Sequence, residues 1–93
     1  MFTGIIQAQG TCQAIDKSAG GSVFTITTSD GFLEHSVVGD SICVLGTCLT
    51  ATSIIANSFT ADASLETLAC TTLGDRAVGD SLNLERALTP TTA

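Results

Sequence analysis

The segment Ser22–Thr28 alternates strictly between apolar and polar residues. Phe24 and Ile26 fall on one face, whereas Thr25 and Thr27 fall on the other. A period of two residues is typical of a β-strand with one face in the core. This segment is therefore the clearest strand that the sequence predicts.

Strand-forming residues also recur in short stretches bounded by Gly, Asp, Asn and Ser, which favour turns. These stretches predict five further strands, at Ile5–Ile15 with a possible kink at Gly10, Asp40–Leu45, Cys48–Ile55, Ser58–Ala63 and Ser81–Arg86. The segments between them predict turns at Asp16–Gly21, Ala56–Asn57 and Gly74–Asp75, and a loop or helical turn at Asp30–Val37. Most of the chain is thus expected to be short strands and tight turns.

The period changes from two to that of a helix in Ser64–Cys70. Leu65 and Leu68 are three residues apart, which places them on one helical face. Ser64 is a suitable N-cap residue, and the negative charge of Glu66 in the first turn complements the helix dipole. We expect one short helix here.

One short pattern occurs twice, because Val38–Ile42 reads VGDSI and Val78–Leu82 reads VGDSL. Each copy predicts a Gly-Asp turn that leads into a strand. About six strands and one short helix in 93 residues favour a small closed antiparallel barrel, since closure removes exposed strand edges. The barrel is expected to span residues 1–87, with 88–93 as a flexible tail.

The length of 93 residues predicts a single domain with a small core. The chain has four Phe but no Trp or Tyr, so the core is expected to be mainly aliphatic. Small cores of this kind often need a partner surface, which makes oligomerisation plausible.

The net charge of -6 argues against binding to nucleic acid or to an anionic membrane surface, because both require clustered basic residues. Lys17, Arg76 and Arg86 are the basic residues, and they form no cluster in the sequence. The sequence contains no apolar run of the roughly 20 residues that a transmembrane helix needs. The N-terminus has no positively charged stretch typical of a secretion signal, so a soluble cytoplasmic protein is expected.

The four cysteines form no CxxC pair, and the chain has a single histidine, His35. This is not the spacing or the number of ligands that structural zinc sites use. A structural metal site is therefore not expected. Cys12, Cys43 and Cys70 are interpreted as buried small apolar residues.

The segment Gly39–Thr52 places Ser41, Cys48 and Thr50 on two adjacent predicted strands, where small polar groups can line a ligand site. Each residue also has a structural explanation: Ser41 beside Asp40 by hydrogen bonding to the turn backbone, Cys48 by packing, and Thr50 as a good strand former. Asp62, on the polar face of its strand, fits a solvated acid slightly better than a ligand-binding group. His35 is expected at the surface. The residues alone do not decide between these alternatives.

Five motifs in the same order resemble the riboflavin synthase family. They are MFTGII at Met1–Ile6, GDSI with GTCLT at 39–50, FTADASLETL at Phe59–Leu68, TTLG at Thr71–Gly74, and VGD with NLERA at 78–87. The family counterparts read MFTGIV, GDSIAVNGVCLTV, FTVDVSPETL, TTLG and GDxVNLERAL. The resemblance covers nearly the whole chain and is much more specific than any one motif.

This resemblance implies an all-β, six-stranded antiparallel Greek-key barrel with one short helix. It also implies a reaction in which two molecules of 6,7-dimethyl-8-ribityllumazine exchange a four-carbon unit to give riboflavin, without a metal or redox cofactor. Ser41 and Cys48 match positions in the catalytic pocket. Substrate-binding positions are matched by Phe2, Thr3, Gly4, Ile6, Thr50, Asp62, Ala63, Ser64 and Thr67, and the segment that begins at Phe2 corresponds to one that reaches a neighbouring barrel.

Two departures from the family affect these expectations. Leu45 stands where the family usually has Asn, so a polar group in the central turn is absent. The family enzyme has two barrels in tandem and forms a trimer, so this chain is expected to be the N-terminal half and to bind ligand with little or no turnover. Its expected partner is a second barrel or a second copy of itself. The alternative is a lumazine- or flavin-binding protein without catalytic activity.

Overall fold

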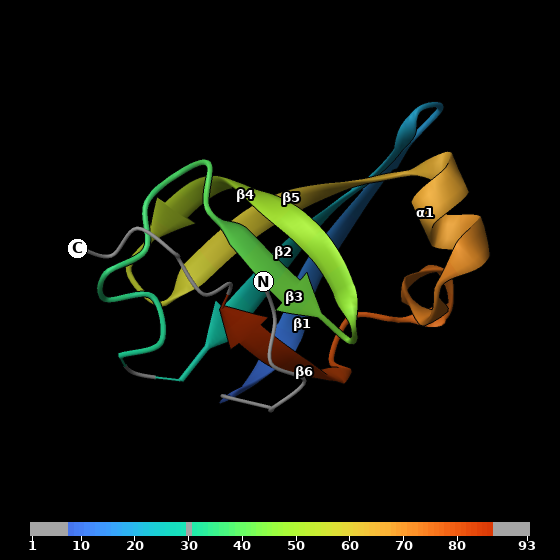
Figure 1. The fold of residues 1–93 in the computed structure, drawn as a ribbon. Coiled ribbons are helices and arrows are strands. Elements are labelled where there is room, and N and C mark those ends of the chain that lie inside the picture. Colours follow the sequence, from blue (N-terminus) through green and yellow to red (C-terminus); the bar gives the residue numbers. More distant parts are fainter. Residues whose placement is uncertain (1–7, 30, 87–93) are drawn as a thin grey trace.

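The computed structural model describes residues 8–29 and 31–86. This part of the chain contains β1 (Ala8–Ser18), β2 (Gly21–Thr28), β3 (Ser41–Val44), β4 (Thr47–Ile55), β5 (Ser58–Ser64), α1 (Leu65–Cys70), a short 3-10 helix η1 (Thr72–Asp75) and β6 (Ser81–Arg86). The strands surround a common core, and α1 and η1 lie together at one end (Figure 1).

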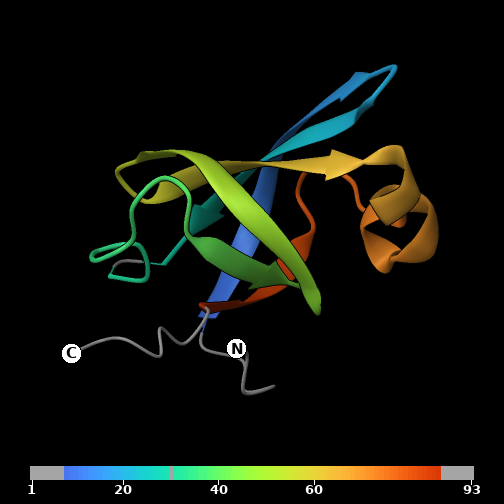
Figure 2. The ribbon, with the colours of Figure 1, turned by 45° about the horizontal axis from the view of Figure 1, so that its top comes forward.

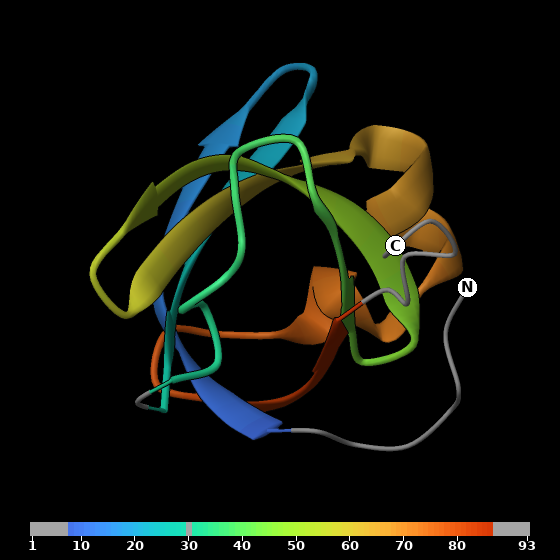
Figure 3. The same cartoon turned by 60° about the vertical axis from the view of Figure 1, so that its left-hand side comes forward.

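The strands close into a barrel in the order β1-β2-β5-β4-β3-β6, and every neighbouring pair is antiparallel. The ring is visible in Figure 3. The strands β3, β4 and β5 follow one another as hairpins. A longer connection joins β2 to β3, and β2 lies beside β5. This is a Greek-key arrangement, so the predicted fold class is confirmed.

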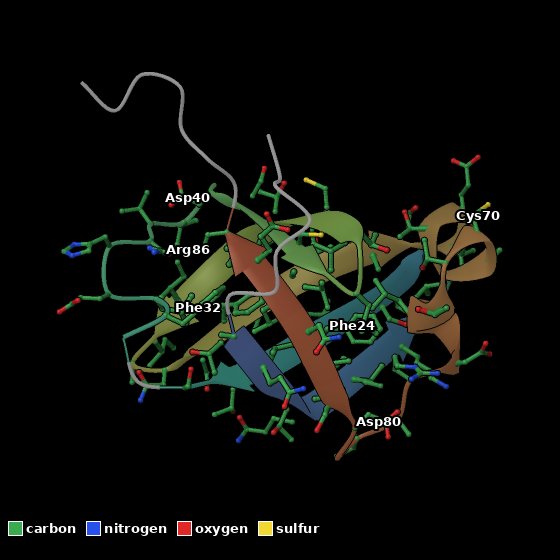
Figure 4. The ribbon with its side chains drawn as sticks, turned by 60° about the horizontal axis from the view of Figure 1, so that its bottom comes forward. Phe24, Phe32, Asp40, Cys70, Asp80 and Arg86 are labelled. Atoms are coloured by element: carbon green, nitrogen blue, oxygen red, sulfur yellow. The ribbon has the colours of Figure 1, made fainter. Side chains whose placement is uncertain are left out.

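The barrel interior is filled by apolar side chains from alternate positions of the strands. Phe24 and Ile26 of β2 and Phe59 of β5 are almost completely buried, and Phe24 is labelled in Figure 4. The guanidinium of Arg86, the last residue of β6, lies 5.7 Å from the ring centroid of buried Phe32. The predicted core face of β2 is confirmed, and Asp62 lies on the exposed face of β5 as expected.

The two Gly-Asp turns have the same hydrogen bonds. The Asp40 carboxylate accepts from the Val37 amide at 3.0 Å, and the Asp80 carboxylate accepts from the Ala77 amide at 2.8 Å. The residue before each Asp is a glycine with φ near +100°, a conformation that side chains disfavour. The sequence repeat is therefore a structural repeat.

Each turn is also bonded to a neighbouring strand in the same way. Gly39 donates to Ala51 of β4, and Gly79 donates to Cys12 of β1. Ala51 and Cys12 both stand where the register of their strand shifts. The two halves of the barrel are thus related, with β3 and β4 equivalent to β6 and β1.

The first strand differs from its prediction. Residues 5–7 lie outside the described residues, as does the expected tail at 88–93. At its other end β1 continues beyond Ile15 to Ser18, and the predicted turn at Asp16–Gly21 is shorter, because Lys17 and Ser18 pair with β2. The long β1–β2 hairpin extends away from the barrel (Figure 2).

The predicted helix is confirmed as α1. The Ser64 hydroxyl accepts from the Thr67 amide at 3.1 Å, as expected of an N-cap. No helix in the described ranges has both the length and the apolar character needed to cross a membrane.

Candidate functional site

A pocket of about 610 Å³ lies where the β1–β2 hairpin, β4, the end of β5 and the first turn of α1 meet. Ligand pockets of proteins commonly have volumes of about 300–1,000 Å³. The pocket is lined by Ser18, Gly20, Gly21, Ser22, Val23, Cys48, Leu49, Thr50, Thr52, Asp62, Ala63, Ser64 and Thr67. Most of these residues are small, and many carry a hydroxyl group.

The pocket lies on the outer surface of the barrel. Along β4, Leu49 and Ala51 are buried in the core, whereas Cys48, Thr50 and Thr52 are exposed. The alternation of strand side chains explains this arrangement, since every second residue points outward. It produces a row of one thiol and two hydroxyls along one wall.

Asp62 of β5 is the one charged residue among the described residues that line the pocket. It is paired with Val23 of β2 in the strand register, so both residues lie on the same side of the sheet. The Asp62 side chain is exposed, and none of the described residues donates a hydrogen bond to it. Its carboxylate can therefore accept hydrogen bonds from a ligand.

The start of α1 holds two hydroxyls in fixed positions. The Ser64 hydroxyl accepts from the Thr67 amide and donates to the Thr67 hydroxyl at 3.0 Å. Because these bonds cap the helix, they orient both side chains without requiring a ligand. The two hydroxyls border the pocket beside Asp62.

One of the two glycines in the hairpin, Gly21, lets its backbone approach β5 closely. A Cβ atom added to Gly21, whose φ is +142°, would lie 2.1 Å from the carbonyl oxygen of Ala63. A Cβ atom added to Gly20 would meet nothing within 4 Å. The absence of a side chain at Gly21 thus lets the β1–β2 hairpin pack closely against Ala63 of β5.

The structure brings together six of the residues that the sequence selected. Cys48, Thr50, Asp62, Ala63, Ser64 and Thr67 all line the pocket. Ser41 is outside the lining but lies directly opposite Thr50 in the β3–β4 register. Phe2, Thr3, Gly4 and Ile6 lie outside the described residues. Their assignment to the site stays a prediction.

Sequence reasoning missed the hairpin wall, which consists of Ser18, Gly20, Gly21, Ser22 and Val23, and also Leu49 and Thr52. In the sequence, Gly20 and Gly21 belong to the predicted turn Asp16–Gly21. A glycine at the start of a strand also permits close approach of another backbone, and Gly21 is that signal in the sequence.

Two interpretations of cysteines are corrected. Cys48 is exposed and borders the pocket, so the explanation of Cys48 by packing is wrong. Cys70 is exposed on α1, not buried, because no residue of this short helix is buried (Figure 4). Cys12 and Cys43 are buried as expected.

The His35 side chain is at the surface, as expected, with 82% of it exposed. Within residues 8–29 and 31–86, no three His, Cys, Asp or Glu residues are placed to hold a metal ion.

Comparison with known protein families identifies the domain. A family profile described as "Lumazine binding domain" matches residues 3–87. The chain belongs to the lumazine-binding domains of the riboflavin synthase family.

Curated relatives of this lumazine-binding domain are riboflavin synthases. The chain is 42% identical to the riboflavin synthase of Chlamydia pneumoniae over 88 residues, which are 95% of this chain and 44% of that protein. It is 44% identical to the enzyme of Bacillus subtilis, covering 95% of this chain and 40% of that protein. The chain therefore spans less than half the length of these relatives.

Solved structures similar to the domain contain ligands. LumP complexed with 6,7-dimethyl-8-(1'-D-ribityl) lumazine superimposes with a TM-score of 0.86 at 30% identity, over 94% of this chain and 49% of that one. LumP complexed with riboflavin also gives a TM-score of 0.86, over 92% of this chain and 46% of that one.

Proposed function

We propose that this domain binds 6,7-dimethyl-8-ribityllumazine and riboflavin in the pocket between the β1–β2 hairpin and α1. The observation that carries the proposal is the set of hydroxyl and carboxylate groups on the outer face of β4, β5 and α1, in a domain of the lumazine-binding family. A ribityl chain has several hydroxyls, each of which can donate and accept a hydrogen bond. Thr50, Asp62 and Ser64 offer matching groups.

The proposed division of roles follows from position. Asp62, Ser64 and Thr67 lie together at the end of β5 and the start of α1, where they would bind the polar ribityl chain. Cys48 and Thr50 lie on β4, across the pocket, and would face the heteroaromatic ring. Ser41, opposite Thr50 in the strand register, would contact a ligand that extends beyond the lining toward β3.

The domain would act as one half of a riboflavin synthase. The reaction joins two lumazine molecules, begins with removal of a proton from a methyl group, and transfers a four-carbon unit between the rings. Holding the two rings against each other would contribute much of the rate increase. A pocket on the outer face of one barrel suits this task, because a second barrel can present its own ligand to the first.

The isolated domain is therefore proposed to bind ligand with weak or no turnover. A second copy of the chain could occupy the position of the second barrel, as a homodimer. The alternative is a lumazine- or flavin-holding protein without catalytic activity, which the similarity to the ligand complexes of LumP supports.

Incubation with 6,7-dimethyl-8-ribityllumazine tests the proposal. We expect the lumazine to bind saturably, and riboflavin fluorescence to appear over hours, or not at all, at micromolar protein. Turnover on the order of 1 s⁻¹ or faster, which is ordinary for enzymes, would show that the single barrel is a complete catalyst. Absence of lumazine binding would contradict the proposed function itself.

A further inference from the structure

The residues Cys43 and Cys48 face each other across the β3–β4 hairpin. The two-residue turn Leu45–Gly46 is flanked by Val44 and Thr47, which form a pair joined by backbone hydrogen bonds. Hydrogen-bonded and non-hydrogen-bonded pairs alternate along an antiparallel hairpin, so the next pair, Cys43 and Cys48, has no backbone hydrogen bond between its members.

At the other end of the hairpin, the Ala51 amide donates a hydrogen bond to the Asp40 carbonyl at 2.9 Å, so Asp40 and Ala51 are also a hydrogen-bonded pair. Counting back from this pair gives the same result for Cys43 and Cys48.

This type of pair brings two side chains close together. The Cα atoms of directly opposed residues without backbone bonds are about 4.5 Å apart. Disulfides join residues whose Cα atoms are about 4.4–6.8 Å apart. The backbone of the hairpin can therefore accommodate a bond between the two sulfur atoms.

The other half of the barrel shows that side chains at this position do meet. In the repeat, β6 and β1 correspond to β3 and β4, so Asn83 and Gln9 correspond to Cys43 and Cys48. The Gln9 Nε2 atom donates a hydrogen bond to Asn83 Oδ1 at 3.2 Å. Two longer side chains thus make direct contact across the equivalent pair.

The two thiols have different environments, which assigns them different roles. Cys48 is exposed and lines the pocket, whereas Cys43 is buried but does not belong to the core cluster. Burial raises the pKa of the Cys43 thiol, a backbone hydrogen bond from Gly46 partly offsets this, and the nearby charges of Glu85 and Cys48 raise it further. Cys48 is accordingly the thiol that reagents reach first.

We propose that Cys43 and Cys48 form a thiol–disulfide exchange site at the edge of the pocket. Cys48, as thiolate, attacks a low-molecular-weight disulfide, forms a mixed disulfide and releases one thiolate. Cys43 then loses its proton to water and attacks Cys48 Sγ, which forms the Cys43–Cys48 disulfide and releases the second thiolate. In total, two protein thiols are oxidised, one external disulfide is reduced to two thiols, and the two protons end on the released thiols.

Oxidation would also affect the pocket, an extension that rests on the proposed function. In the disulfide, the Cys48 sulfur has lost its proton and can no longer donate a hydrogen bond to a ligand. The bond to Cys43 also fixes the position of this sulfur next to β3. We expect the dissociation constant for the lumazine to rise about fivefold in the oxidised protein. Because binding and oxidation are linked, the lumazine should make the disulfide harder to form by the same factor.

The test is equilibration of the folded protein with mixtures of reduced and oxidised glutathione, followed by alkylation, intact mass measurement and peptide mapping. We expect Cys43 and Cys48 to become unavailable to alkylation together, as one internal disulfide. Buried Cys12 should remain alkylatable after denaturation, whereas exposed Cys70 should carry at most a glutathione adduct and no protein disulfide. The matched variant Cys43→Ala should retain glutathione on Cys48. In the wild-type protein this adduct should be less than about a tenth as abundant, because the internal thiol resolves it.

A glutathione adduct on Cys48 that is equally abundant in the wild-type protein and Cys43→Ala would overturn the proposal. So would a disulfide that instead involves Cys70. Cys70→Ser serves as a second control and should leave the crosslink unchanged. If the crosslink forms but the lumazine does not bind either redox form, the proposed function fails while the exchange site stands. If the lumazine binds both forms equally, the coupling is wrong.

Discussion

Replacing Gly21 with alanine is expected to lower the free energy of unfolding by about 3 kcal/mol. The new Cβ atom would lie 2.1 Å from the Ala63 carbonyl oxygen, and the φ of +142° is unfavourable for any residue with a side chain. Either the hairpin or the end of β5 must move. Since small domains are stabilised by only about 5–15 kcal/mol, the loss should be plain in urea or thermal unfolding.

The neighbouring glycine provides a matched control for this substitution. Gly20 also lines the pocket, but a Cβ atom there meets nothing within 4 Å, so Gly20→Ala should change stability by less than about 0.5 kcal/mol. Gly21→Ala should also weaken lumazine binding, because the displaced strand end includes Asp62 and Ser64. Equal stability of the two variants would show that the close approach of the hairpin to β5 is not important.

The substitution Asp62→Asn is expected to raise the dissociation constant for 6,7-dimethyl-8-ribityllumazine about tenfold. A carboxylate accepts stronger hydrogen bonds from hydroxyls than an amide oxygen does, and Asn keeps the size of the side chain. Because Asp62 is exposed and has no donor among the described residues, the variant should unfold at nearly the wild-type temperature. Fluorescence titration and thermal unfolding measure the two effects.

The control for net charge is Asp75→Asn. Asp75 lies in η1, is exposed, and does not line the pocket, but its substitution removes the same charge. We expect unchanged lumazine affinity. A tenfold loss in both variants would mean that overall charge, not a contact with Asp62, determines the affinity.

The sequence predicted those strands whose two faces differ. In β2 and β5, core residues alternate with polar ones, and the predicted and observed bounds agree within one residue. The end of β1 was missed because Asp16, Lys17 and Ser18 are all exposed, so no alternation marks them as a strand. Their structure depends on pairing with β2, a contact that the local pattern does not contain.

The candidate site was predictable in its residue types but not in its assembly. The exposed thiol and hydroxyls of β4 and the carboxylate of β5 are adjacent because the barrel places β5 between β2 and β4. From the residues alone, Cys48 and Asp62 each had an ordinary structural explanation. The family resemblance selected them, and the fold explains why they lie in one pocket.

Leu45 shows how a departure from the family pattern is accommodated. It has a positive φ of 51°, which Asn adopts more readily than Leu. Its side chain packs against the core, and its amide donates to the Asn83 carbonyl at 2.9 Å. Packing and this hydrogen bond therefore help to hold the residue in an unfavourable backbone conformation. Leu45 is not among the described residues that line the pocket.

The most direct test of the account is to map lumazine binding onto the domain by NMR, following backbone amide shifts during titration with 6,7-dimethyl-8-ribityllumazine. We predict saturable shifts concentrated at 18–23, 48–52 and 62–67, with little change at the distant turn Ala56–Asn57. Saturable shifts centred elsewhere on the barrel, or none at all at high ligand concentration, would contradict the assignment of this pocket as the lumazine site.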